Sequence, residues 1–102
     1  MTGSPGGSRI ITAVLQIIVN VIDRGMSVGE AVAAPRIHHQ WLPDQVSAER
    51  RVAAEVLRGL ESRGHHVTPT LGQTSANSIL VTPDGLIGAA DPRTRGALAA
   101  GY

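Results

Sequence analysis

A glycine-rich segment runs directly into an apolar stretch near the start of the chain, and this junction constrains the fold most. Residues 3–9 read GSPGGSR, and residues 10–22 are apolar except at Thr12, Gln16 and Asn20. We predict a loop over residues 1–8 and a helix over about 8–23 that ends at Gly25. Because the polar positions lie on one stripe that continues to Arg24, we expect little of this helix to contact water.

The same junction is a candidate anion site. The first N–H groups of a helix have no partner within it, and the helix dipole adds partial positive charge there. Glycine also allows a ligand to approach the backbone closely. However, the loop lacks both GxxxxGK[ST] and GxGxxG, and the residues before it are too few to supply a strand. The loop alone leaves both a structural turn and a ligand-binding turn open.

The middle of the chain predicts alternating short helices and strands. The segment from Ser27 to Glu30 fits a capping box that opens a short helix, which Pro35 stops. Residues 36–41 are expected to be a strand or an extended loop. Residues 45–49 read either as a short strand or, with Ser47 as cap, as the entry to the next helix.

The second half adds one amphipathic helix and a hairpin. Residues 51–63 place their apolar side chains on one helical face, which predicts a helix lying on a sheet. Residues 65–68 read as a short strand. Residues 78–82 and 86–90 flank the turn sequence PDG and predict two antiparallel strands. Helices packed on antiparallel strands give an α+β fold class.

Composition excludes several classes of function. The chain has 102 residues, a formal net charge of +1, no Phe and no Cys. With only Trp41 and Tyr102 as aromatic residues, nucleic-acid binding is not expected. The absence of cysteine excludes disulfides and thiolate metal sites. Residues 10–22 are too few to span a bilayer, so no membrane segment is expected.

Two histidine pairs, His38-His39 and His65-His66, are the candidate metal ligands. Neighbouring side chains on an extended chain point to opposite faces, so the two members of a pair cannot bind one metal ion. Packed or surface histidines are the simpler interpretation. We therefore predict neither a metal nor a cofactor.

Four motifs in order carry a resemblance to a known family. Besides residues 3–11, they are residues 34–44 (APRIHHQWLPD), residues 64–67 (GHHV), and residues 91–93 (DPR) with the final GY. Together they resemble the small subunit of gamma-glutamyltransferase, also called gamma-glutamyltranspeptidase or glutathione hydrolase. The resemblance favours a strand at residues 45–49. It implies that residues 1–102 are one partial domain, the C-terminal segment of that subunit, within the αββα sandwich of the N-terminal nucleophile hydrolases.

The resemblance also implies a chemistry. Members of this family are made as a precursor that cleaves itself and exposes an N-terminal threonine. That threonine attacks the γ-glutamyl amide of glutathione-like compounds, and the γ-glutamyl group passes to water, an amino acid or a peptide. The backbone N–H groups of Gly6 and Gly7 would form the oxyanion hole. The family's threonine and the residues that bind the γ-glutamyl group precede the glycine loop, so Thr2 is not the nucleophile and the chain alone is expected to be inactive.

Two arginines are expected to act structurally. Arg36 and Arg93 each lie in a motif with a proline and a nearby acid, Asp44 or Asp91. We predict that both arginines bridge carboxylates and fix the C-terminal strands. Direct contact with substrate is the alternative.

The expected partners follow from the resemblance. They are the large subunit, the N-terminal part of the small subunit and a glutathione-like substrate, in a periplasmic or secreted enzyme. An isolated chain should expose apolar surface and could self-associate. Two other functions stay open: a non-catalytic, self-associating interaction module, and a glycine loop that binds phosphate or another anion.

Overall fold

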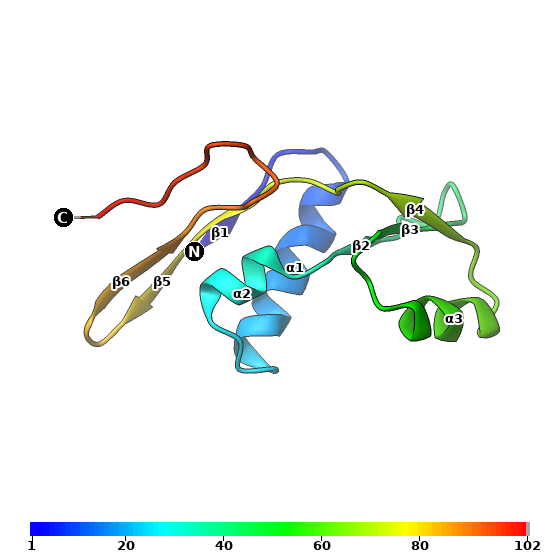
Figure 1. Cartoon of the computed structure of the whole chain (residues 1–102), viewed down its shortest axis with the longest axis horizontal. Helices are drawn as coiled ribbons and strands as arrows, with labels where there is room; N and C mark the ends of the chain where they lie inside the picture. Colours follow the sequence, from blue (N-terminus) through cyan, green and yellow to red (C-terminus); the bar gives the residue numbers. More distant parts are fainter. Residues whose placement is uncertain (102) are drawn as a thin grey trace. The chain divides into compact units, whose positions relative to one another are not determined.

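The computed structural model describes residues 1–101, which form two compact units (Figure 1). The first unit contains Met1–Ala34 and the segment that begins at Thr74, and the second is Pro35–Gln73. Tyr102, part of the C-terminal motif named above, lies outside the described residues. Each unit has its own three-stranded sheet and at least one helix.

The first unit contains an antiparallel sheet of order β1-β5-β6. Its strands are β1 (Thr2–Gly3), β5 (Asn77–Thr82) and β6 (Gly85–Ala89). The predicted hairpin is confirmed, because Thr82 pairs with Gly85 across a two-residue turn.

The expectation that the residues before the glycine loop form no strand is wrong. Thr2 and Gly3 pair with Ser78 and Asn77, and Met1 exchanges two backbone hydrogen bonds with Ile79 at 2.7 and 2.8 Å. A very short strand suffices here because the edge of β5 supplies backbone partners for residues 1–3.

Helices α1 (Arg9–Ile22) and α2 (Val28–Ala33) contact this sheet. The core of the unit comprises Ile17, Val28, Ala31, Val32, Ala76 and Ala89. The capping box that opens α2 is confirmed, since Ser27 Oγ accepts from Glu30 N at 3.2 Å and Ser27 N donates to Glu30 Oε2 at 2.9 Å. The hydrogen bond from the Ser27 backbone N–H, supported by the one from its side chain, lowers the pKa of the Glu30 carboxyl below its ordinary value of 4.5.

Helix α1 forms where predicted, but the expectation that little of it contacts water is wrong for this chain. Only Ala13, Ile17 and Asn20 are buried, so one member of the expected polar stripe lies inside. An apolar stripe along the helix is exposed instead: Ile11, Leu15, Ile18 and Ile22. The hydrophobic pattern of a helix shows which of its faces other elements can cover. Whether a face is buried depends on the helices and strands that pack against it.

The second unit is a sheet of order β2-β3-β4 with one helix. Its elements are β2 (Ile37–His38), β3 (Val46–Glu49), α3 (Ala54–Ser62) and β4 (Val67–Thr70). The strand at 45–49 is confirmed, and the alternative in which Ser47 caps a helix is wrong, because Ser47 lies within β3.

A parallel pair of strands is the feature of this unit that the sequence patterns did not predict. Strand β3 pairs with β2 antiparallel but with β4 parallel, and α3 forms the connection between the two parallel strands. The helix contacts β4, although none of its residues is fully buried. With both units described, the α+β class is confirmed. Among residues 1–101, no helix has the length and apolar character needed to cross a membrane.

Candidate functional site

The glycine loop at the start of α1 presents two backbone donors to solvent. Gly6 and Gly7 have φ angles of 119° and 59°, and both residues are exposed. Their carbonyl oxygens accept hydrogen bonds from Arg9 N and Ile10 N, each at 3.2 Å. Within residues 1–101, neither the Gly6 amide nor the Gly7 amide donates a hydrogen bond to another residue. These two adjacent N–H groups are therefore available to an acceptor outside the chain.

The electrostatic environment of the loop favours a negatively charged ligand. The loop leads into a helix of 14 residues whose first turn carries no acidic side chain. The partial positive charge at the helix N-terminus is thus not neutralised by a carboxylate on that turn. An oxygen that carries negative charge would be stabilised at this position.

Glycine is required at the two positions for different reasons. A Cβ atom on Gly6 would lie 3.0 Å from Thr74 Oγ1 and 3.2 Å from Thr74 Cβ, so both the contact and the positive φ exclude a side chain. A Cβ atom on Gly7 would meet nothing within 4 Å. Only the left-handed backbone conformation disfavours a side chain there, at a cost of about 1–2 kcal/mol.

Two hydroxyl side chains hold the loop, and sequence reasoning missed both. Ser4 Oγ lies 2.6 Å from Ser75 O and 3.0 Å from Thr74 Oγ1, and the Thr74 hydroxyl donates to Pro5 O. Ser4 and Thr74 are 70 positions apart. No local pattern links residues at this separation, so the sequence carried no signal for the contact.

The predicted partners Arg93 and Asp91 lie together in the first unit. Asp91 is 0% exposed, and its Oδ1 accepts from Arg93 N at 2.9 Å and from Arg93 Nη1 at 3.1 Å. Its other oxygen accepts from Ala76 N at 2.7 Å. The guanidinium also donates to Val32 O at 2.9 Å and to Ala34 O at 2.8 Å. This network joins the segment after β6 to the start of β5 and the end of α2.

Arg36 and Asp44, in contrast, are not brought together. The Asp44 side chain is 87% exposed and contacts His39 Nε2 at 3.2 Å, whereas Arg36 is buried. The backbone of Arg36 is joined to Glu49, with Arg36 N donating to Glu49 Oε2 and Glu49 N donating to Arg36 O, both at 3.0 Å. Glu49 Oε1 also accepts from Gln73 N at 2.9 Å, which makes Glu49 a buried carboxylate that the sequence patterns did not single out.

The histidines occupy separate surroundings. His38 is buried and its Nε2 lies 2.9 Å from Gln40 Oε1. His39 contacts Asp44, and its ring lies at 72° to the ring of His65, with the two ring centroids 6.1 Å apart. Across residues 1–101, no three or more His, Asp or Glu side chains form a group that could hold a metal ion.

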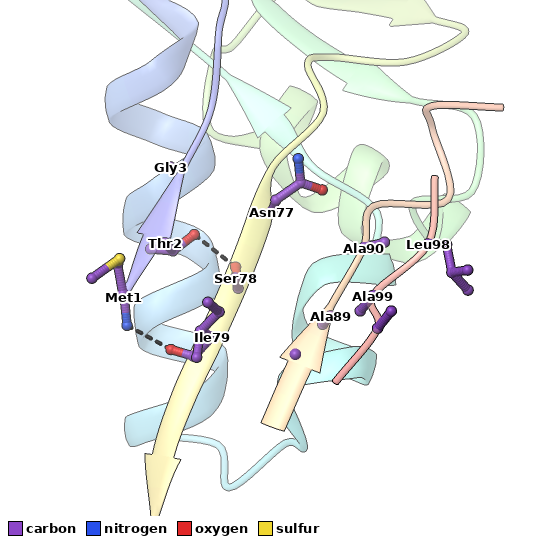
Figure 2. A pocket seen from close by; sticks show the side chains of 12 residues that line it. Met1, Thr2, Gly3, Asn77, Ser78, Ile79, Ala89, Ala90, Leu98 and Ala99 are labelled. Carbon is purple, nitrogen blue, oxygen red and sulfur yellow. Dashed lines mark hydrogen bonds between the residues drawn. The ribbon is translucent and has the colours of Figure 1, made fainter. Parts of the chain in front are cut away.

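One cleft of the first unit does not include Gly6 or Gly7. A cleft of about 590 Å³ is lined by β1, β5, β6 and residues 98–100 (Figure 2). Its walls are mostly small and apolar, and the hydrogen bond between Ser78 Oγ and Thr2 Oγ1 at 2.8 Å lies along one side. Among residues 1–101, no titratable side chain lines this cleft.

Comparison with known proteins gives one consistent result. A family model described as Gamma-glutamyltranspeptidase matches residues 1–101. The glutathione hydrolase proenzyme of Escherichia coli strain K12 is 53% identical over 103 residues, a match that covers 100% of this chain and 18% of that protein.

Two solved structures extend the comparison to the fold. Gamma-glutamyltranspeptidase from Pseudomonas nitroreducens, complexed with L-DON, matches 99% of this chain and 54% of its own, with 33% identity and a TM-score of 0.87. Cephalosporin acylase from Bacillus halodurans matches 99% of this chain and 19% of its own, with 27% identity and a TM-score of 0.89. The described residues are thus a mixed α+β segment that matches structures of N-terminal nucleophile hydrolases, and the chain spans less than a fifth of the E. coli relative.

Proposed function

Because the chain belongs to the gamma-glutamyltranspeptidase family, we propose that it supplies the oxyanion hole of an enzyme acting on γ-glutamyl amides. The observation that carries this proposal is the pair of exposed amides of Gly6 and Gly7 before α1, neither of which donates a hydrogen bond within residues 1–101. The substrate class is glutathione-like compounds, and the γ-glutamyl group passes to water, an amino acid or a peptide.

The chemistry places a specific demand on this loop. When a hydroxyl attacks the γ-glutamyl carbonyl, the carbonyl oxygen becomes negatively charged in a tetrahedral intermediate. Two N–H donors fixed about 2.7–3.1 Å from that oxygen stabilise it more than the uncharged substrate, and this difference accelerates the reaction. As the intermediate collapses, the carbon–nitrogen bond breaks, the leaving amine takes a proton, and an acyl-enzyme ester remains.

The rest of the machinery lies outside this chain in our proposal. The nucleophile is an N-terminal threonine whose α-amine takes the hydroxyl proton, and it is exposed when the precursor cleaves itself. The large subunit and the N-terminal part of the small subunit supply it together with the residues that grip the γ-glutamyl group. Both units described above then belong to one partial domain of an αββα sandwich in a periplasmic or secreted enzyme. On this proposal, the 102-residue chain alone should release no p-nitroaniline from γ-glutamyl-p-nitroanilide.

A chimera provides the test. Residues 1–102 replace the matching segment of the E. coli glutathione hydrolase proenzyme, and release of p-nitroaniline from γ-glutamyl-p-nitroanilide is followed. Gly7→Ala is compared with Gly25→Ala. Gly25 has a φ of 66° and, like Gly7, has nothing within 4 Å of an added Cβ, so the two variants carry the same backbone penalty.

A side chain strains the backbone of residue 7 at its positive φ, and relief of that strain should move the amide away from the reacting oxygen. We therefore expect kcat of the Gly7→Ala chimera to fall by about 10- to 1,000-fold. Gly25→Ala should retain the parental kcat, because it lies at the other end of α1. Equal activity in the two variants would refute the proposal, as would a parental chimera that folds and cleaves itself but hydrolyses nothing.

A second function rests on the same two amides. If the loop binds phosphate instead of a reaction intermediate, the NMR amide signals of Gly6 and Gly7 should shift and saturate as inorganic phosphate is titrated into the chain. Saturation below millimolar phosphate, combined with an inactive chimera, would favour this function over catalysis.

A further inference from the structure

We propose that Thr74, together with Ser4, is a positioning residue that aims the Gly6 amide at the reacting oxygen. This inference rests on the proposed function, since it assigns a role within the same loop. It concerns the two hydroxyl side chains that hold the segment just before the glycine pair, and neither hydroxyl contacts the substrate in this scheme.

The peptide unit between Pro5 and Gly6 links the two hydroxyls to the Gly6 amide. A peptide unit is planar, and in its trans form the C=O and N–H bonds point in opposite directions. Fixing Pro5 O therefore fixes the direction of the Gly6 N–H. The Thr74 hydroxyl donates to Pro5 O, and Ser4 Oγ lies 2.9 Å from the same oxygen. Both hydroxyls are thus on the side of the peptide opposite to the amide.

The two hydroxyl side chains, of Ser4 and Thr74, form a clamp on the loop that is itself anchored to the segment entering β5. Ser4 Oγ lies 2.6 Å from Ser75 O and 3.0 Å from Thr74 Oγ1, so both side chains are tied to the segment that enters β5. The Thr74 side chain also occupies the space beside Gly6, where an added Cβ would come within 3.2 Å of Thr74 Cβ. The Thr74 side chain therefore lies directly beside Gly6.

The neighbouring amide is oriented by a different element. Gly7 N–H shares its peptide unit with Gly6 O, which accepts from Arg9 N at the start of α1 at 3.2 Å. Helix α1 thus fixes the direction of the Gly7 N–H, while Thr74 and Ser4 fix the direction of the Gly6 N–H. Loss of the Thr74 hydroxyl should misdirect one donor of two and leave the other in place.

The test uses three threonine variants in the chimera with the E. coli proenzyme. Thr74→Val removes the hydroxyl and keeps the branched shape, and Thr74→Ser keeps the hydroxyl. Thr82→Val is the matched control, because Thr82 Oγ1 also donates to a backbone carbonyl of the first unit, Gly85 O at 2.9 Å, away from the loop.

Because the oxyanion exists only in the transition state and the intermediate, Thr74→Val should lower kcat by about 10- to 100-fold and leave KM within about twofold. Thr74→Ser should recover most of the lost kcat, and Thr82→Val should match the parent. A Thr74→Val enzyme with parental kcat, or with a raised KM and unchanged kcat, would overturn the assignment. If Thr74→Val yields no soluble enzyme, Ser4→Ala decides, since its kcat must then fall at constant KM.

Failure of this inference can be separated from failure of the proposed function. If Gly7→Ala lowers kcat but Thr74→Val and Ser4→Ala do not, the oxyanion loop stands and the clamp is only structural. If none of the three changes kcat, the oxyanion role itself is refuted.

Discussion

Replacing Asp91 with asparagine is the most informative perturbation of the fold that supports the loop. The Asp91 carboxylate is 0% exposed and uses both oxygens as acceptors: Oδ1 for Arg93 and Oδ2 for Ala76 N. Asparagine has one oxygen, so its NH₂ group must face an N–H donor on one side. The change also removes the charge that opposes the Arg93 guanidinium, whose side chain is only 15% exposed.

The magnitude follows from these contacts. A hydrogen bond to a charged group contributes about 1.5–3 kcal/mol, and breaking a buried ion pair by removing one partner costs about 3–5 kcal/mol. Arg93 keeps its bonds to Val32 O and Ala34 O, which limits the loss. We therefore expect Asp91→Asn to lower the free energy of unfolding by about 3–5 kcal/mol, a large part of the 5–15 kcal/mol typical of a domain.

The assay is urea unfolding of the chain followed by far-ultraviolet circular dichroism. With a slope of about 2 kcal/mol per molar urea, the midpoint should fall by roughly 2 M. Asp44→Asn is the matched control, since that carboxylate is 87% exposed and has a single contact with His39, so its effect should stay below about 1 kcal/mol. Equal midpoints for the two variants would refute the reasoning.

Two further predictions concern the helices of the first unit. The capping box should give Glu30 a carboxyl titration midpoint below 4.5 in NMR, and Ser27→Ala should move it partly back while lowering stability by about 0.5–2 kcal/mol. Because the pKa of Glu30 is lower in the folded state, the stabilisation by its carboxylate is present above pH 4.5 and is lost as the pH falls through the folded-state pKa. A titration midpoint of Glu30 at or above 4.5 would contradict this. The exposed apolar stripe of α1 should make the isolated chain self-associate, so Leu15→Lys should weaken association in sedimentation velocity while Leu71→Lys, at an exposed position of the second unit, should not. A parent chain that stays monomeric at all concentrations would refute that expectation.

Features that depend on neighbours in the sequence were predictable. Helix α1, the Ser27 capping box and the hairpin of β5 and β6 follow from hydrophobic period, capping chemistry and turn residues. The glycine loop was likewise identified from local composition. Its family motif and its exposed amides point to the same two residues, although their catalytic role remains a proposal.

Features that depend on distant contacts were not predictable from these patterns. Strand β1 exists only because β5 lies beside it, and the parallel pairing of β3 with β4 requires α3 as a connection. The clamp of Ser4 and Thr74 joins residues 70 positions apart. The exposed face of α1 depends on which elements are present to cover it, and periodicity alone does not supply that information.

The central claim is that the Gly6 and Gly7 amides receive the negative oxygen of the tetrahedral intermediate. A crystal structure of the chimera bound to a γ-glutamyl boronic acid, whose tetrahedral boronate mimics that intermediate, tests it most directly. We expect one boronate oxygen about 2.7–3.1 Å from both glycine nitrogens. A tetrahedral boronate whose oxygens contact other donors, with both glycine amides still facing solvent, would contradict it.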